Sequence, residues 1–347
     1  SRALALKPKL KSQLHNSRLK AYHGIIMIKQ IVRRAQVNDQ HLPDSLQPLI
    51  KQIYARRGVS SSEQLALTLD QLISAEHLLG IEQACQLLQQ AYIDNSNIII
   101  IGDFDADGAT STALMMEALS LLGFSKHSFI VPNRFEYGYG LTPEIVDIAN
   151  QQQAQVIITV DNGISSIEGV AAAKARGWQV LVTDHHLPGA SLPAADAIVN
   201  SNQAGDEFPS KNLAGVGTIF YVCVALRSHL RDLGWFTRNN IEEPNMAQYL
   251  DLVALGTVAD VVPLDANNRV LVAQGLARIK AGQCSPGLLA LLSIAKTHLP
   301  DLSASDLAFA VGPRLNAAGR LDDMSYGINC LLAPDLASAR VMARDLD

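Results

Sequence analysis

This 347-residue sequence contains few cysteines and no long apolar run. Its four cysteines lie far apart and form no CxxC pair, which argues against a disulfide framework and against a thiolate zinc site. No apolar stretch approaches the roughly 20 residues that a membrane-spanning helix needs. These absences predict a protein of the reducing cytoplasm that has no membrane partner.

The sequence also lacks an excess of positive charge. Its 28 Lys and Arg residues are outnumbered by 33 Asp and Glu residues, and the net charge of −5 argues against a protein that coats nucleic acid through its overall charge. Any contact with nucleic acid must therefore be local. Carboxylates that hold divalent metals would contribute to this acidity, and bound cations would reverse the local sign.

The first 38 residues contain several Lys and Arg but no Asp or Glu. Such a stretch can serve as a basic arm for a phosphate backbone. We expect residues 1–26 to be an upstream extension instead, because they show no clear helical period and are followed directly by Met27. No apolar stretch follows the charges, which argues against a signal peptide.

Residues 27–96 are predicted to form an N-terminal helical region. The stretch 44–58 is typical of a helix that ends at a glycine, the stretch 61–69 begins with a capping-box pattern, and residues 81–93 are amphipathic. We expect these helices to cover one end of a sheet.

Residues 97–265 predict an α/β domain with a doubly wound, mainly parallel sheet. Short apolar runs at 98–101, 128–131, 155–160 and 179–183 alternate with helical stretches at 112–123, 143–153 and 166–177. The runs are continuously apolar, as expected for parallel strands that are buried on both faces. The chain is mainly helical from residue 215 onward, and we treat 266–347 as a separate helical C-terminal part.

Acidic and histidine side chains follow the predicted strands, at the point where each strand ends. In doubly wound sheets, ligands bind at the carboxyl ends of the strands. The residues placed there are Asp103, Asp105 and Asp107 after the first strand, Asp161 after the third, and Asp184, His185 and His186 after the fourth. A further acid, Asp260, follows an apolar segment that ends at Ala259.

These side chains suit a pair of divalent metal ions. Hard cations prefer carboxylate oxygens, and a histidine nitrogen among them suits Mn²⁺ better than Ca²⁺. Two cations about 3.5–4 Å apart can activate a water and neutralise charge on a phosphoryl group. The predicted ligands are Asp105, Asp107, Asp161, His185 and Asp260, with Asp103 as an additional candidate.

Other interpretations of these motifs fit less well. A calcium loop starting at Asp103 would need a glutamate at its twelfth position, which is Leu114, and a helix rather than a strand before it. The DxDGT signature of haloacid-dehalogenase-type phosphatases would need a hydroxyl where Ala109 stands. A single histidine is more often structural, and an Asp-Asn-Gly turn is by default a hairpin signal. Their gathering at one sheet edge favours function.

Taken together, the motifs DFDADG, VDNG, DHH and GTVADVVPLD resemble those of the DHH phosphoesterase superfamily. The segments VPNRFEYGYGL, TDHHLPG, LAGVGTIFY and GPRLNAAGRLDD are similar to its bacterial single-strand exonucleases. The resemblance covers roughly Met27 to Asp347.

The resemblance implies a role for each motif residue. Asp105 would bind one metal ion and Asp107 the other, Asp161 would bridge the two, and His185 and Asp260 would complete the shells. His186 would face the scissile phosphate, so that the catalytic set is Asp105, Asp107, Asp161 and His186. Many members carry a histidine four residues before the first liganding aspartate; here that residue is Ile101, so Asp103 or water would fill the shell.

The resemblance also implies phosphate ligands, namely Arg134, Arg314, Asn316 and Arg320. A guanidinium group can engage two phosphate oxygens at once, although each arginine could equally form a structural salt bridge. The aromatic residues Phe135, Tyr137 and Tyr139 either stack bases or pack their own loop.

The activity implied by the resemblance is a metal-dependent 5′-to-3′ exonuclease that acts on single-stranded DNA, releases 5′-mononucleotides and serves DNA repair and recombination. Mn²⁺ or Mg²⁺ would be the cofactor, and a helicase and a single-strand-binding protein would be partners. Such enzymes continue into a second domain and an OB-fold beyond the region matched here, so we expect this chain to degrade long strands poorly. The alternatives are a non-catalytic DNA-binding scaffold and a small-oligonucleotide phosphoesterase.

Overall fold

The computed structural model describes residues 32, 35, 37–321 and 324–347, without the side chains of residues 134, 135 and 319–321. The predicted extension at residues 1–26 lies outside this part. A five-stranded parallel sheet has the order β2-β1-β3-β4-β5. Its strands are β1 (Ile98–Ile101), β2 (His127–Ile130), β3 (Val156–Val160), β4 (Gln179–Thr183) and β5 (Ala197–Val199). The predicted α/β fold is confirmed; β5 was not predicted, because its three residues are too short to give a pattern.

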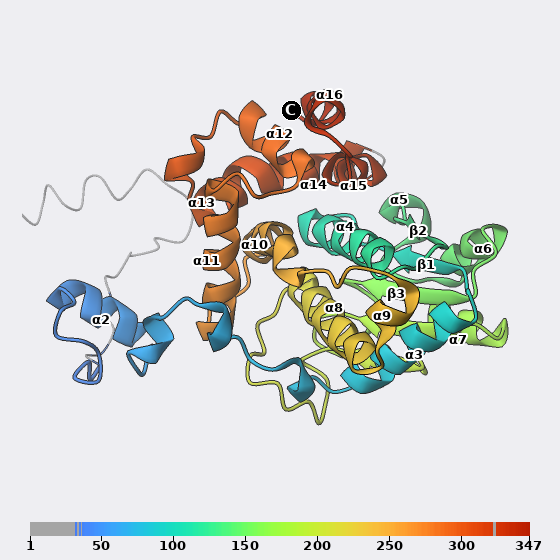
Figure 1. The fold of residues 1–347 in the computed structure, drawn as a ribbon, viewed down its shortest axis with the longest axis horizontal. Coiled ribbons are helices and arrows are strands. Elements are labelled where there is room, and N and C mark those ends of the chain that lie inside the picture. The colour runs from blue at the N-terminus through green and yellow to red at the C-terminus, as the bar shows by residue number, and fades with distance from the viewer. Residues whose placement is uncertain (1–31, 33–34, 36, 322–323) are drawn as a thin grey trace, which may run out of the picture.

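The sheet is buried between two layers of helices (Figure 1). All four side chains of β1 are fully buried, and they alternate between two apolar clusters. One cluster includes α3 (Ile81–Ile93), α4 (Ala106–Leu121) and α8 (Gly215–Asp232). The other includes α6 (Pro143–Gln151) and α7 (Ile167–Ala175). Burial on both faces explains why the strand residues are continuously apolar.

The chain reverses its winding direction between β1 and β3. After β1 it passes through α4 to β2 on one side, and after β3 it passes through α7 to β4 on the other. The two crossover helices cover opposite faces of the sheet. The loops that follow β1 and β3 therefore diverge and leave a crevice at their carboxyl ends, the usual ligand position in this strand order.

A helical C-terminal part packs against the sheet domain, as predicted. Helix α10 (Leu250–Ala259) contacts α4 and α8, and α11 (Ala266–Lys280) packs along α10. The chain continues through α12 (Pro286–Ile294), the short α13 (Ala304–Asp306), a π-helical segment (Leu307–Val311), α14 (Gly312–Leu321), α15 (Ser325–Leu331) and α16 (Leu336–Asp345). A single apolar cluster contains buried residues of both parts, from Leu78 to Leu346. These helices therefore share the core of the sheet domain.

Within the N-terminal region, the part around α2 lies away from the sheet (Figure 1). Helix α2 (Pro48–Arg56) is followed by Gly58 in the left-handed conformation, as predicted. The predicted helix at 61–69 is wrong. Only a 3₁₀ turn forms there, because the Ser61 and Ser62 hydroxyls bond the Glu63 carboxylate instead of capping a helix. Helix α3 forms as predicted and packs against β5 and β4.

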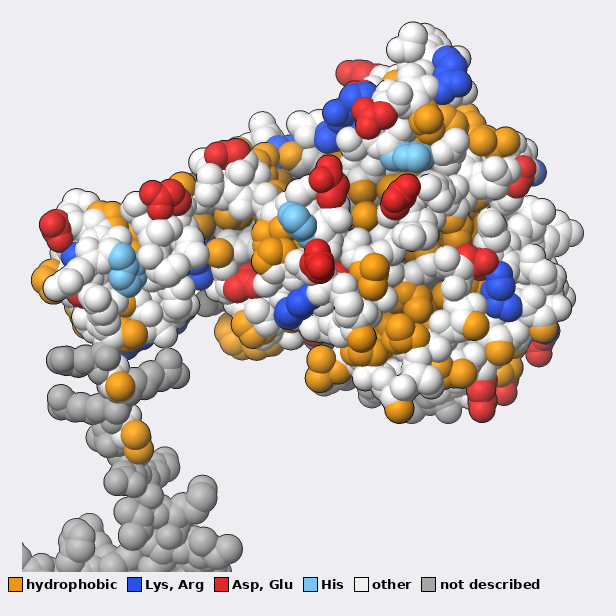
Figure 2. Space-filling model, turned by 90° about the horizontal axis from the view of Figure 1, so that it is seen from below, with side chains coloured by type: hydrophobic (Ala, Val, Ile, Leu, Met, Phe, Trp, Pro, Cys, Tyr) orange, Lys and Arg blue, Asp and Glu red, His pale blue; other side chains and the backbone are white. Residues whose placement is uncertain are grey.

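Short elements complete the chain. They are the 3₁₀ turns Glu63–Leu65, Leu69–Gln71, Ala75–His77, Met246–Tyr249 and Leu299–Asp301, with the small helices α5 (Arg134–Tyr137) and α9 (Trp235–Asn239). Within the described residues, every helix is too short or too polar to cross a bilayer. On the face seen in Figure 2, basic side chains are few and lie scattered among acidic ones, which agrees with the low net charge.

Helix α11 approaches α10 so closely that only glycine fits at residue 275. A Cβ atom there would lie 2.1 Å from the Leu250 carbonyl oxygen and 2.4 Å from the Ala254 Cβ. We predict that Gly275→Ala lowers the free energy of unfolding by about 1–3 kcal/mol, because the backbone must move. Urea denaturation measures this. Gly189→Ala is the control, since no atom lies within 4 Å of its added Cβ; equal stability of the two variants would contradict the packing argument.

Candidate metal centre

The loop after β1 carries three aspartates onto the start of α4. This helix begins at Ala106, six residues earlier than the sequence pattern indicated, so Asp105 is its N-cap and Asp107 lies in its first turn. The Asp105 Oδ1 accepts a hydrogen bond from the Gly108 amide at 2.9 Å. A Cβ at residue 108 would lie 2.6 Å from the Asp103 Cβ, so the loop closes this tightly only over glycine. The three carboxylates are thereby held in one turn.

Asp107 is buried, and the start of α8 holds both of its oxygens. The amide of Gly215 donates to Oδ2 at 2.6 Å, and the amide of Val216 donates to Oδ1 at 2.9 Å. The N-terminus of a helix favours a negative charge. Burial and the neighbouring Asp105 and Asp260 nevertheless keep the pKa of Asp107 well above its usual range.

Asp161 follows β3 in a strained turn. Its φ of 62° is left-handed, a conformation that costs a non-glycine residue about 1–2 kcal/mol. Asn162 stabilises the turn by donating to the carbonyl oxygens of Ile101 at 3.0 Å and Val160 at 2.9 Å, which ties the ends of β1 and β3 together. The turn leads into the segment before α7, so this Asp-Asn-Gly sequence is not a hairpin.

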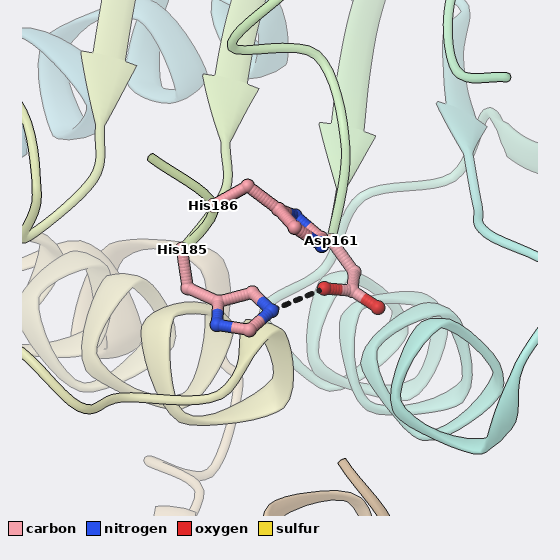
Figure 3. Close-up of side chains that lie close together, drawn as sticks. All are labelled: Asp161, His185 and His186. Carbon is pink, nitrogen blue, oxygen red and sulfur yellow. Dashed lines mark ion pairs between the residues drawn. The ribbon is translucent and has the colours of Figure 1, made fainter. Parts of the chain in front are cut away.

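His185 lies between the acidic loops and directs its Nε2 toward Asp161 (Figure 3). That nitrogen lies 3.1 Å from Asp161 Oδ1, 3.6 Å from Asp260 Oδ2 and 3.9 Å from Asp107 Oδ2. Neither His185 Nε2 nor Asp161 Oδ1 makes a hydrogen bond within the described structure, although both are buried. Because the ring also bonds the Leu213 backbone, that contact falls to Nδ1 and leaves the lone pair of Nε2 for a ligand.

Side-chain donors converge here into sets whose ligand atoms lie within 4.8 Å of one another. The sets are Asp103, Asp105 and Asp161; Asp107, His185 and Asp260; and Asp161, His185 and His186. All five predicted ligands, and the additional candidate Asp103, are therefore brought together beyond the carboxyl ends of the strands. Asp161 lies between the first two sets, since it belongs to one and its Oδ1 approaches His185 of the other.

This crowding of acids is unfavourable without cations. Burial and the charge of Asp105 raise the pKa of Asp103 to about 7 and that of Asp260 to about 6. Burial and the surrounding aspartates also raise the pKa of Asp161 well above its usual range. Buried charges are normally paired or bound to metals. The orphaned oxygen and nitrogen at the centre, with this carboxylate and imidazole donor set, fit divalent ions.

His186 has a different environment from His185. Its Nδ1 lies 2.7 Å from Asp184 Oδ1, and this bond raises the pKa of His186 to about 9. Burial lowers the pKa of His185 to about 4, with a contribution from the positive charge of His186. One histidine is thus a neutral donor and the other a half-exposed cation.

Asp184 positions His186, a role that the sequence analysis did not assign. Its Oδ1 also accepts the amides of both histidines, and its Oδ2 accepts the Ile164 amide at 2.9 Å. Burial alone would raise the pKa of Asp184, but the bonds from His186 hold it below its usual value. An aspartate two residues before a histidine was the available signal.

Asn200 and Asn202 also hold this loop. They donate to the carbonyl oxygens of His186 at 2.9 Å and His185 at 2.6 Å. Nothing in the sequence pattern distinguished these two asparagines from ordinary loop residues.

The predicted phosphate ligands are only partly described. Asn316 lies beside the first acidic loop, where its Oδ1 accepts the Ala106 amide at 2.7 Å. The Arg314 guanidinium bonds Asp347 and the Ala310 carbonyl oxygen. The side chains of Arg134 and Arg320 lie outside the described residues. Phosphate binding by all four therefore stays a prediction.

The aromatic residues that could stack bases have different fates. Tyr137 packs against the apolar cluster of α6 and α7, and the Phe135 side chain lies outside the described residues. Tyr139 is 47% exposed, and its ring lies 6.1 Å from that of His186.

Ile101, which stands four residues before Asp105, is fully buried in the sheet. Asp103 lies with Asp105 and Asp161 at the first donor set.

Known proteins that resemble this chain share its central domain. Residues 97–257 match the family described as "DHH family, N-terminal domain". The chain is 56% identical over 319 residues to the single-stranded-DNA-specific exonuclease RecJ of Salmonella typhimurium, covering 92% of this chain and 55% of that protein. It is 33% identical over 293 residues to RecJ of Thermus thermophilus, covering 84% and 40%. The chain thus spans about half the length, or less, of these curated relatives.

Solved structures that resemble this chain include two of exonuclease RecJ. The crystal structure of exonuclease RecJ bound to manganese superposes with a TM-score of 0.67 at 34% identity, covering 78% of this chain and 65% of that one. The crystal structure of RecJ in complex with Mn²⁺ from Thermus thermophilus gives a TM-score of 0.69 at 32% identity, covering 84% and 40%.

The acidic cluster predicts how stability depends on pH when metal is removed with EDTA. The folded-state pKa of Asp103, about 7, lies above its unfolded value of about 3.9, so its contribution to stability is lost as pH rises through about 7. We expect Asp103→Asn to gain about 1 kcal/mol relative to the wild type between pH 6.5 and pH 8. Urea denaturation at both pH values measures this.

The control for this experiment is Asp232→Asn, which changes an exposed aspartate at the end of α8. It should follow the wild type at both pH values. Added Mn²⁺ should stabilise the wild type more at pH 8 than at pH 6.5, because ligands must be deprotonated to bind it. A pH dependence that Asp103→Asn leaves unchanged would contradict the electrostatic description.

Proposed function

We propose that this chain is a member of the DHH family, whose N-terminal domain matches residues 97–257, and that it is a metal-dependent exonuclease that cuts single-stranded DNA from the 5′ end. The product would be 5′-mononucleotides. The observation that carries the proposal is the convergence of Asp107, Asp161 and Asp260, from three separate segments, on one histidine nitrogen. The 56% identity to a single-stranded-DNA-specific exonuclease supports the choice of substrate.

In this proposal the centre holds two ions, either Mn²⁺ or Mg²⁺. Asp105 and Asp103 serve one ion, Asp107, His185 and Asp260 serve the other, and Asp161 serves both. When bound, such ions lower the pKa of a water and neutralise charge on a phosphoryl group. The orphaned Asp161 Oδ1 and His185 Nε2 support this assignment, because a buried polar atom without a partner is rare and costly.

The chain's own groups would prepare the phosphate and the attacking water. His186 would face the scissile phosphate with Nε2, since Asp184 occupies its Nδ1. With a pKa of about 9 it carries a proton at neutral pH, so it can donate a hydrogen bond to an oxygen that gains charge. The backbone amides of Gly215 and Val216 orient Asp107 and oppose the rise in its pKa.

Phosphates beyond the scissile one would lie toward α14 and α5. Asn316 is already next to the first acidic loop, and Arg314, Arg320 and Arg134 would join it in holding the 5′ end. Arg314 would have to exchange Asp347 for a phosphate, which a guanidinium group can do because its fork suits either oxyanion.

The wider role would be DNA repair and recombination in the cytoplasm, with a helicase and a single-strand-binding protein as partners. The division into a catalytic part at 97–265 and a helical part at 266–347 belongs to the same proposal. A non-catalytic scaffold is disfavoured because all the predicted ligands are present and adjacent. Comparing the hydrolysis rates of dinucleotides and of longer strands distinguishes the proposed exonuclease from a small-oligonucleotide phosphoesterase.

Replacing the shared carboxylate gives the sharpest test. We expect Asp161→Asn to lower Mn²⁺-dependent cleavage of a 5′-phosphorylated single-stranded oligonucleotide by about 100-fold or more, because one substitution disturbs both ions. Release of mononucleotide from a 5′-labelled strand, compared with a 3′-labelled strand and with duplex, measures activity, polarity and strand preference together.

The matched control is Asp196→Asn, which removes a carboxylate that directly precedes β5 and bonds Lys174 of α7. Its activity should stay within about two-fold of the wild type. Near-normal turnover by Asp161→Asn would refute the shared-carboxylate assignment, and equal cleavage of duplex and single strands would refute the proposed substrate.

A further inference from the structure

A short loop between α5 and α6 closes over the candidate metal centre. Tyr139 stands in it between Gly138 and Gly140, whose φ angles of 79° and 71° are left-handed. The next residue, Leu141, donates its amide to Ser166 Oγ at 3.2 Å, which anchors the loop to the segment after β3. Two glycines with this geometry let the backbone turn sharply on either side of one side chain.

The Tyr139 hydroxyl joins two of the acidic loops. It donates a hydrogen bond to the carbonyl oxygen of Asp161 at 3.2 Å, and the Asp103 carboxylate lies beside it as an alternative acceptor of the same proton. Although the residue is half-exposed, burial of its hydroxyl and the nearby carboxylates raise the pKa of Tyr139, so the phenol keeps its proton. The hydroxyl therefore connects the loop after β1 to the loop after β3.

The Tyr139 ring contacts the loop after β1 and also the loop after β4. It meets Phe104 edge-to-face at 6.1 Å and His186 edge-to-face at 6.1 Å. Such ring pairs are directional contacts. One side chain thus touches residues that follow β1, β3 and β4, the three strands whose loops supply most of the candidate ligands.

We infer that Tyr139 is a positioning residue for the two-metal centre, acting through its hydroxyl on Asp161 and Asp103. This inference rests on the proposed function. The left-handed turn at Asp161 must be held by its surroundings, because that conformation is unfavourable for a non-glycine residue. A bond to the Asp161 carbonyl oxygen fixes that turn and hence the direction of the carboxylate, and the Asp103 carboxylate beside the hydroxyl can accept the same proton, so the hydroxyl acts on both loops.

The test is Tyr139→Phe, which keeps the ring and removes the hydroxyl. We expect its Mn²⁺ affinity, measured by titration with electron paramagnetic resonance, to fall about 10-fold, as is usual when a group that orients metal ligands is lost. The kcat on a 5′-phosphorylated single strand should fall by a similar factor, with KM within two-fold. Urea denaturation in EDTA checks that the fold is retained.

The matched control is Tyr221→Phe, which removes a buried tyrosine hydroxyl that donates to Asn267 at 2.8 Å, away from the acidic loops. It should lose stability but keep its Mn²⁺ affinity. A second variant, Tyr139→Leu, removes the ring as well and should bind Mn²⁺ as weakly as Tyr139→Phe or more weakly.

The outcomes separate the inference from its alternatives. Wild-type Mn²⁺ affinity and kcat in Tyr139→Phe would overturn it. If only Tyr139→Leu changes, through a higher KM, the residue is a stacking surface for bases and the positioning role is also overturned. If Tyr139→Phe binds Mn²⁺ weakly while the wild type cleaves no DNA, the positioning role stands and the proposed function fails.

Discussion

The repulsion among buried carboxylates at the end of the sheet is the constraint on which the rest of the structure depends. Asp103, Asp107 and Asp161 are almost fully buried, and each raises the electrostatic cost of the others. The fold offsets part of this cost with backbone amides: the start of α8 serves Asp107, and Gly108 serves Asp105. Amides stabilise anions without competing for the space between them, which leaves that space to cations.

The same constraint explains where the molecule needs glycine. A Cβ at Gly215 would lie 2.5 Å from Asp161 Oδ1, and one at Gly256 would lie 2.7 Å from Asp107 Oδ1. These two positions belong to α8 and α10, so two long helices reach the centre at points where they carry no side chain. The acids can then approach one another from different elements, and a single added methyl group would separate them.

Much of the sheet and the centre could be predicted from the sequence, because both depend on local patterns. The isoleucines of β1 are continuously apolar because both faces are covered, and the acids follow the strands directly. Features set by tertiary contacts could not be predicted. The serines before Glu63 have the sequence of a helix cap but bond a neighbouring carboxylate, and the early start of α4 is fixed by contacts of its first turn. Asp184, Asn200 and Asn202 support the histidines through the folded loop alone.

Asp260 differs from the other acids because it follows the last turn of α10, a helix of the C-terminal part. The other acids follow strands of the sheet or lie in the first turn of α4. Ions held by Asp260 together with the other acids would link the sheet to α10. Helices α11 to α16 share an apolar cluster with α10, so the same ions would also link them indirectly to the sheet. Cations would thus strengthen a contact between the two halves that their shared apolar core already makes, and chelation would weaken it at a place where no disulfide among the described residues joins them.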